Sequence, residues 1–308
     1  MIKVVSTLNL GREEWLQYRK QGIGGSDAGA ICGLNPYRTA IQVYQDKVSD
    51  VCEDIDNEAM RQGREFEDYV ARRFMEATGK KVRRANAMFR SKDHPFMLAD
   101  VDRMIVGENA GLECKTASPY MAEKWKDGKV PLSYQIQCHH YMAVCGADAW
   151  YIAVLIYGRE FKYYRVERDE ELIADLIRVE QDFWENNVQK RIMPAPDGSK
   201  VADSVIAEYY KDSVAESIRL TGFDEKLRRR QELVEVIGRM ETEKNQIEQE
   251  VKMYMGTAEV AENEQYRVSW KSVSSTRIDE KRLKAELPQV YEQYKRMSSS
   301  RRFSIKAA

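Results

Sequence analysis

The segment from Ala110 to Thr116 constrains the fold most, because its residues suit the two faces of a β-strand. Side chains two residues apart point to the same side of a strand. Glu113 and Lys115 therefore share one face, while Leu112 and Cys114 take the other. The sequence predicts a strand that holds an acid and a base side by side.

A second carboxylate precedes this strand. Asp102 follows the largely apolar run 96–101, and the residues 107–109 supply a turn. We expect the run 96–101 to pair antiparallel with the strand, which would bring Asp102 beside Glu113 and Lys115. Two carboxylates suit Mg²⁺ or Mn²⁺, and a nearby lysine can orient or deprotonate an attacking water. In a chain with 32% charged residues, the alternative is a solvated strand face.

Two predicted helices add polar groups. The first runs from Ile55 to Gly79, and Glu67 lies one turn after Gly63 on the same face, so its side chain would lean over the space above the glycine. The second runs from 133 to 144 and places Gln137 and Tyr141 on one face, where they can orient a water or a phosphate oxygen. The alternatives are close helix packing at Gly63 and ordinary surface polarity.

A glycine-rich segment, 22–30, lies near the start of the chain. Ser26 and Asp27 within it are typical of a helix N-cap, and free N–H groups at such a terminus attract phosphate. Arg19 lies close by in the sequence and can bind a phosphate through two parallel hydrogen bonds. A purely structural turn is the alternative, and both interpretations can hold together.

These motifs, taken in order, resemble those of the YqaJ-type viral recombinases, which are phage nucleases related to lambda exonuclease in the PD-(D/E)xK superfamily. The resemblance covers residues 10–200 and rests on W-x3-R, GIGGSDAGAICGLNPY, QGREFED, LADVDR, ECK and YQIQCHHY. It implies an α/β fold with a restriction-endonuclease-like core, a central mixed sheet flanked by helices. The proline of the superfamily name is absent, since Val101 precedes Asp102.

The resemblance also implies roles for individual residues. Asp102, Glu113, Glu67 and the backbone carbonyl of Cys114 would hold Mg²⁺, with Mn²⁺ as a substitute, and Lys115 would help to activate water.

The remaining roles concern the substrate and its orientation. Gln137 is the motif glutamine, chosen over the neighbouring Gln135. Arg19 and Ser26 would hold a DNA 5′-phosphate, and Tyr141 is a further candidate.

The implied activity is that of a Mg²⁺-dependent deoxyribonuclease, a processive 5′-to-3′ double-strand exonuclease that makes 3′ tails for phage recombination by strand annealing. Its expected partners are double-stranded DNA ends, a single-strand annealing protein and further copies of itself in a trimeric ring. No GxxxxGK[ST] motif occurs, so we expect no need for ATP. An endonuclease of the same fold and a non-catalytic DNA-binding or scaffolding protein remain alternatives.

Composition adds further expectations. The net charge is −1, so DNA binding would need a local basic surface. No run of about 18 apolar residues and no signal peptide are evident, so we expect a cytoplasmic protein of a bacterial host. Five scattered cysteines without a CxxC pair argue against structural zinc or an iron–sulfur cluster. His139 and His140 are adjacent in a helix, so they would point apart.

We expect a nuclease core over residues 1–200 and an extension over 201–308. In the core, the strand 150–156 pairs with 160–166, Asp169 caps a helix, and a boundary follows at 194–198.

The extension reads as a two-helix or coiled-coil stretch over 203–255, broken at Gly222 and ended by Gly256. A strand at 266–270 and a helix capped by Asp279, which stops before Pro288, follow. Residues 265–308 hold 11 Lys and Arg against 4 Asp and Glu, a net +7, while the remainder of the chain carries −8. This asymmetry favours a nucleic-acid or acidic-partner surface, with a solvated tail as the alternative.

Overall fold

The computed structural model describes residues 1–50, 57–296 and 301–306. The chain divides into two units, Met1–Tyr210 and Lys211–Ala308, so the division falls ten residues after the boundary expected at 200. The later position has a physical reason, because the helix Lys200–Tyr209 (α7) packs against Ala40–Val48 (α3) in the first unit.

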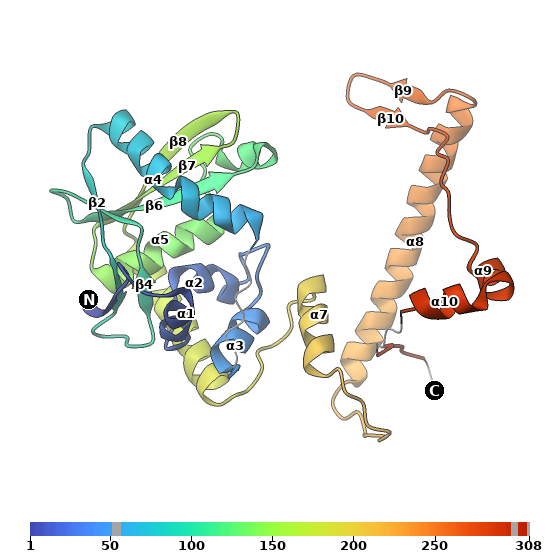
Figure 1. Ribbon diagram of the computed structural model, residues 1–308, viewed down its shortest axis with the longest axis horizontal. Helices are drawn as coiled ribbons and strands as arrows, with labels where there is room; N and C mark the ends of the chain where they lie inside the picture. The colour runs from blue at the N-terminus through green and yellow to red at the C-terminus, as the bar shows by residue number, and fades with distance from the viewer. Residues whose placement is uncertain (51–56, 297–300, 307–308) are drawn as a thin grey trace. The chain divides into compact units, whose positions relative to one another are not determined.

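The first unit is built around a mixed sheet with strand order β2-β5-β6-β7-β8 (Figure 1). The two long central strands, β6 and β7, run parallel, and the other neighbours are antiparallel. This confirms the predicted α/β class with a central mixed sheet. Its strands are Val82–Arg84 (β2), Arg103–Ile105 (β5), Ala110–Ala117 (β6), Ala149–Ile156 (β7) and Glu160–Glu167 (β8).

Two helices cover opposite faces of this sheet. Glu58–Thr78 (α4) packs Val70 and Phe74 against Leu112 and the odd-numbered residues of β7. Leu132–Cys145 (α5) packs against Trp150 and the other even-numbered residues of the same strand. Because β6 and β7 lie in register, Glu113 and Lys115 face the α5 layer. The predicted alternation along β6 is therefore confirmed.

A smaller sheet and further helices complete the unit. The sheet has the order β1-β3-β4, from Ile2–Ser6, Ala87–Arg90 and Leu98–Asp100. The predicted pairing of 96–101 with β6 is therefore wrong, because β4 pairs with β3 in this second sheet. The antiparallel neighbour of β6 is β5, and the turn at 107–109 joins them. Asp102 lies in the two-residue link between the sheets.

The other helical segments of the first unit are short. They are Arg12–Lys20 (α1), Gly25–Ile31 (α2), the 3₁₀ segment Pro119–Trp125 (η1), Glu170–Asp182 (α6) and the π-helical segment Phe183–Gln189 (η2). The predicted cap of α6 is confirmed, because the Asp169 carboxylate accepts a hydrogen bond from the Leu172 N–H. The start of the predicted helix at 55–79 lies outside the described residues.

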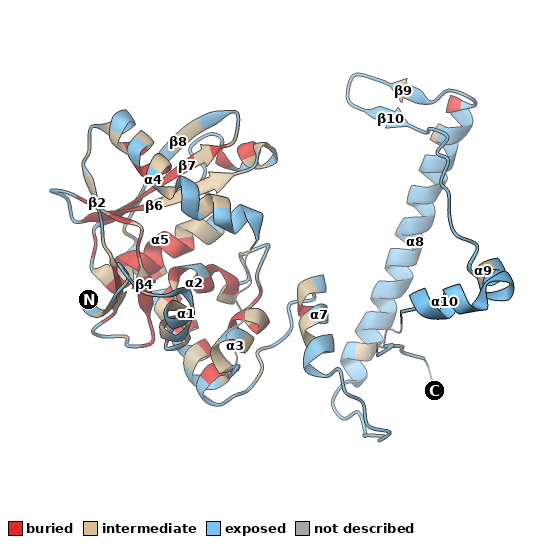
Figure 2. Cartoon of the chain, in the orientation of Figure 1, coloured by how far each residue is buried: buried red, intermediate tan, exposed pale blue. Residues whose placement is uncertain are grey.

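The second unit is dominated by the 32-residue helix Asp224–Met255 (α8), which Gly256 ends as predicted. It is separated from α7 by residues 210–223, a longer break than Gly222 alone. A hairpin of Val260–Glu262 (β9) and Arg267–Ser269 (β10) follows, then Glu280–Glu286 (α9), capped by Asp279 as predicted, and Pro288–Tyr294 (α10). Within the described ranges, no helix is long and apolar enough to cross a membrane. Figure 2 shows buried residues concentrated in the first unit.

Candidate active site

Asp102, Glu113 and Lys115 meet at the edge where β5, β6 and α5 come together. Asp102 Oδ2 accepts a hydrogen bond of 2.7 Å from the Cys114 N–H. Lys115 Nζ donates to Glu113 Oε1 at 2.6 Å. The structure thus brings together the three residues of the D…ExK pattern, although by a different strand pairing from the one expected.

The electrostatics of this cluster are dominated by crowded negative charge. Burial raises the pKa of Asp102 well above its usual range, and the charges of Glu113 and Glu67 raise it further. Burial likewise raises the pKa of Glu113, against the opposing effect of Lys115. Burial alone would lower the pKa of Lys115, but Glu113 and Asp102 raise it, so the lysine is held as a cation.

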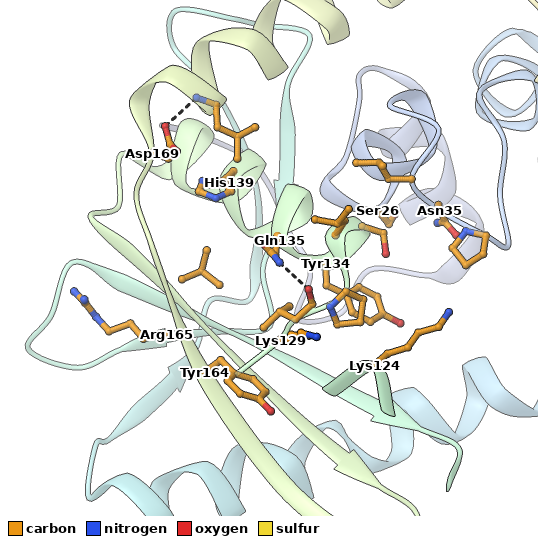
Figure 3. A pocket seen from close by; sticks show the side chains of 18 of the residues that line it. Ser26, Asn35, Lys124, Lys129, Tyr134, Gln135, His139, Tyr164, Arg165 and Asp169 are labelled. Carbon is orange, nitrogen blue, oxygen red and sulfur yellow. Dashed lines mark hydrogen bonds between the residues drawn. The ribbon is translucent and has the colours of Figure 1, made fainter. Parts of the chain in front are cut away.

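Gln137 reaches this cluster from α5. Its Nε2 donates to Glu113 Oε1 at 2.8 Å and lies 3.0 Å from the Tyr141 hydroxyl, so the two residues share a face as expected. Tyr141 in turn donates to the Asp100 carbonyl at 3.1 Å. Gln135 donates instead to the Val130 carbonyl at 2.7 Å, away from the carboxylates (Figure 3).

The two carboxylate oxygens of Glu113 differ in their hydrogen bonds. Its Oε1 accepts two hydrogen bonds, whereas its buried Oε2 has no partner among the described residues. An unpartnered carboxylate oxygen beside a second carboxylate is a donor set that suits a divalent cation. In a strand, the N–H and C=O of one residue point to the same edge, so the Cys114 carbonyl shares the edge at which its N–H meets Asp102.

Glu67 lies on α4, which covers the face of the sheet opposite to α5. Its carboxylate is ion-paired to Arg103 Nη1, and Arg103 also contacts Asp68 and the Asp102 carbonyl. Glu67 is thus close enough to affect both carboxylates, but a cation from β5 already engages it. Across the described ranges, no three His, Cys, Asp or Glu side chains form a ready-made metal site. Sequence reasoning missed Arg103 because its partners come from a distant helix.

Arg19 and Ser26 form a second part of the site. Arg19 Nη2 donates to Ser26 Oγ and to Asp27 Oδ1, both at 3.0 Å. The predicted cap at Ser26 and Asp27 is wrong, because the N-cap is Gly24 and Asp27 lies three residues inside, where its carboxylate accepts from the Gly24 N–H. Gly25 is required by packing, since a Cβ there would lie 2.6 Å from the Tyr141 ring.

Asp27 is fully buried and gathers further cations that the sequence pattern did not reveal. Arg38 contacts its Oδ1 at 2.6 Å, and Lys47 contacts its Oδ2 at 2.8 Å. Burial alone would raise the pKa of Asp27, but Lys47, Arg19 and Arg38 hold it well below its usual range. Burial, together with the positive charges of Arg19 and Arg38, lowers the pKa of Lys47 to about 8 against the opposing effect of Asp27. The cluster leaves an excess of positive charge.

A single cleft of about 960 Å³ connects both parts of the site. Asp102 and Glu67 line it together with Arg19 and Arg38. A larger cavity of about 1580 Å³ begins at Arg19 and Ser26, does not reach Asp102, and carries the basic residues Lys124, Lys129 and Arg165 labelled in Figure 3. An anion held at Arg19 would therefore lie in the same cleft as Asp102 and Glu67.

The two adjacent histidines have separate surroundings, as expected. His140 lies between Glu180 and the Leu98 carbonyl, each at 2.8 Å, whereas His139 lines the larger cavity. His140 is therefore a structural group that joins α5, α6 and β4.

Known proteins resemble this chain over most of its length. Residues 14–148 match the YqaJ-like viral recombinase domain. The uncharacterized protein YqaJ of Bacillus subtilis (strain 168) is 40% identical over 302 residues, which cover 96% of this chain and 95% of that protein.

Solved structures share the fold. An alkaline exonuclease from Laribacter hongkongensis, LHK-Exo, has a TM-score of 0.51 and 21% identity, over 58% of this chain and 94% of that one. LHK-Exo in complex with dAMP gives a TM-score of 0.51 and 22% identity, over the same shares of the two chains. The chain accordingly shares the fold of these alkaline exonuclease structures over the matched part, and it belongs to the family of YqaJ-like viral recombinases.

Proposed function

We propose that this protein is a metal-dependent, ATP-independent deoxyribonuclease, a processive 5′-to-3′ exonuclease on double-stranded DNA that exposes 3′ tails for strand annealing. One observation carries the proposal: Glu113 is buried beside the half-buried Asp102, Lys115 lies 2.6 Å from Glu113, and Glu113 Oε2 has no partner among the described residues. A stable fold has little reason to bring two such carboxylates together away from water unless a cation joins them.

The residues present fit Mg²⁺, with Mn²⁺ as a substitute. The cation would be held by Asp102, Glu113 and the Cys114 carbonyl. Glu67 could bind it only if its ion pair with Arg103 were broken. When bound, the cation would polarise the attacking water and neutralise charge on the scissile phosphate.

The protein's own residues would do the positioning. Gln137 fixes the Glu113 carboxylate through its 2.8 Å hydrogen bond. Lys115, held as an ammonium by two carboxylates, would orient the water and face the phosphate charge rather than accept a proton at the outset. Arg19 and Ser26 would hold the terminal 5′-phosphate, which sets the distance from the chain end to the cut.

The shared cleft favours an exonuclease over an endonuclease, because Arg19 lines the same cleft as Asp102 and Glu67. LHK-Exo has been solved with dAMP, a mononucleotide of the kind that stepwise cleavage would release here. On the resemblance to the YqaJ-type recombinases, we extend the proposal to an annealing protein as partner and to a trimeric ring.

Linear and covalently closed plasmid, each with Mg²⁺ and with a chelator, test the proposal. We expect the linear DNA alone to be degraded, only with Mg²⁺ and without ATP. Cleavage of the closed circle would indicate an endonuclease. No cleavage of either DNA would indicate a non-catalytic role.

A further inference from the structure

The buried ammonium of Lys47, on α3, contacts both the side chain of Asp27 and the backbone of Arg19. Its Nζ donates to Asp27 Oδ2 and to the Arg19 carbonyl, each at 2.8 Å. The Lys47 side chain is only 3% exposed, so it cannot touch a substrate in the cleft. Any effect of Lys47 on DNA must therefore pass through the groups that it contacts.

The Asp27 carboxylate joins these groups into one network. Its Oδ1 accepts hydrogen bonds from Arg19 Nη2 at 3.0 Å and from Arg38 Nη1 at 2.6 Å. Its Oδ2 accepts from Lys47 Nζ and, at 3.0 Å, from the Gly24 N–H. Because a buried carboxylate with four charged or backbone donors has little freedom, the positions of the Arg19 guanidinium and the Lys47 ammonium are linked through it.

The charges in this network do not cancel. Arg38 also forms an ion pair with the carboxylate of Asp46, so three cations face two carboxylates in these contacts. Lys47 balances the charge of Asp27, and Arg38 balances that of Asp46. The positive charge of Arg19 is then left over for another anion.

The Arg19 guanidinium is held on the side away from the cleft that it lines. Its Nη2 makes the contacts with Ser26 and Asp27, and the Trp15 ring centroid lies 4.9 Å from its Cζ. Asp100 accepts a hydrogen bond from the Trp15 indole at 2.6 Å. Among the described residues, Arg19 Nε and Nη1 donate no side-chain hydrogen bond, so these donors remain for a ligand.

We propose that Lys47 is a positioning residue for the terminal phosphate: it neutralises Asp27 and holds the Arg19 backbone, and so keeps the Arg19 guanidinium available to an anion in the cleft. The inference rests on the role that the proposed function gives to Arg19. Without the ammonium, the charge of Asp27 would be shared by the two arginines alone. Asp27 would then attract Arg19 more strongly, in competition with the phosphate.

Binding of short duplexes with 5′-phosphate or 5′-hydroxyl ends to the full-length protein tests this role. Fluorescence anisotropy is measured with a chelator near pH 7, where Lys47 stays charged because its pKa is about 8. The unmodified chain should bind the phosphorylated end more tightly. Lys47→Met should lower this ratio of affinities about threefold or more, with little change for the 5′-hydroxyl duplex. An unchanged ratio, or no preference in the unmodified chain, would overturn the inference.

Two further variants control for folding and for general loss of charge. Lys47→Gln keeps a donor for the Arg19 carbonyl, and it should lower the ratio in the same direction even if Lys47→Met does not fold. Lys20 on α1 donates to the Ser49 carbonyl instead. Lys20→Met should therefore weaken binding of both duplexes alike, if at all, and leave their ratio unchanged. A drop in the ratio for Lys20→Met equal to that for Lys47→Met would overturn the positioning role.

A double substitution tests whether Lys47 acts through Arg19. In an Arg19→Ala chain, Lys47→Met should change the ratio no further, because the group that it positions is gone. A further decrease would show a direct effect of the Lys47 charge on the phosphate and would overturn the inference. Because the assay needs no cleavage, a chain that prefers phosphorylated ends through Lys47 but does not cut DNA would support the inference and contradict the nuclease proposal.

Discussion

At the residue scale, the strongest feature is the pair of carboxylates at Asp102 and Glu113. Both are raised in pKa by burial first and by neighbouring negative charge second. Such a pair lowers the stability of the metal-free fold and becomes favourable only when cations balance it. Lys115 supplies one of these cations permanently, through Glu113 Oε1.

Asp102→Asn and Glu113→Gln should each lower cleavage by roughly 10²-fold or more, because each removes a charge that acts mainly in the transition state. DNA binding should change little, and the metal-free Asp102→Asn protein should be more stable to denaturant than the unmodified chain. Single-turnover cleavage and urea unfolding measure the two effects. Glu65→Gln, at an exposed position on α4, is the matched control. Normal turnover by Asp102→Asn in Mg²⁺ would exclude this site.

Arg19→Ala should remove a preference for 5′-phosphorylated ends. A charged hydrogen bond to phosphate contributes about 1.5–3 kcal/mol, which corresponds to roughly tenfold or more in preference. Initial rates on duplexes with 5′-phosphate and 5′-hydroxyl ends measure it, and Arg178→Ala on the exposed side of α6 is the control. If the unmodified enzyme degrades both ends equally, Arg19 has no such role.

At the scale of elements, α5 organises the first unit. It supplies Gln137 to the carboxylates and Tyr141 to the Asp100 carbonyl, and it holds α6 through the buried contact of His140 with Glu180. One helix therefore couples the position of the site to the packing of three neighbouring elements. The contact of His140 with Glu180 can be tested by pH.

The burial of Glu180 raises its pKa, and Glu180 in turn raises the pKa of His140 against the opposing effect of burial. Both groups then bind protons more tightly in the folded state, so the free energy of unfolding should fall as pH rises from about 4.5 to above 6.5. His140→Gln should remove the part of this dependence near pH 6.5, while Glu180, whose pKa His140 lowers, keeps the part at lower pH. Urea unfolding at several pH values measures it, and an unchanged slope in the variant would show that other groups dominate.

At the scale of the whole molecule, the residues proposed for chemistry all lie in the first unit, and the +7 segment 265–308 lies in the second. Because α7 packs on α3, the first unit extends to Tyr210 rather than to the glycine at 198. On the proposed function, the division separates the cleft for cleavage from the basic segment 265–308.

A chain that ends at Tyr210 should therefore still cleave DNA in Mg²⁺ but bind it less tightly, with the largest loss at low ionic strength, where the basic segment acts most strongly. The logarithm of the binding constant should depend less steeply on salt concentration than for the full chain. Filter binding at several salt concentrations measures this slope. A folded but inactive truncation would mean instead that the second unit completes the active site.

Local patterns in the sequence determined much of this protein. The alternation along β6, the four-residue spacing of Gln137 and Tyr141, and the caps at Asp169 and Asp279 depend on neighbours within a few residues, so they can be read directly. The order of motifs added the family and the fold. Those signals placed Asp102, Glu113 and Lys115 together, although the pairing of 96–101 with β6 from which we expected this contact is wrong.

Only the tertiary structure decided which strand lies beside β6, because β4 and β5 are both short and adjacent in the sequence. It also decided that Arg103 engages Glu67 and that Asp27 gathers Arg38 and Lys47. Buried charged residues form ion pairs with residues of other helices and strands, and such pairs produce no periodic pattern in the sequence. Short-range geometry depends on residues that are close in the sequence. The partners of a buried charge, in contrast, are determined only when distant segments pack together.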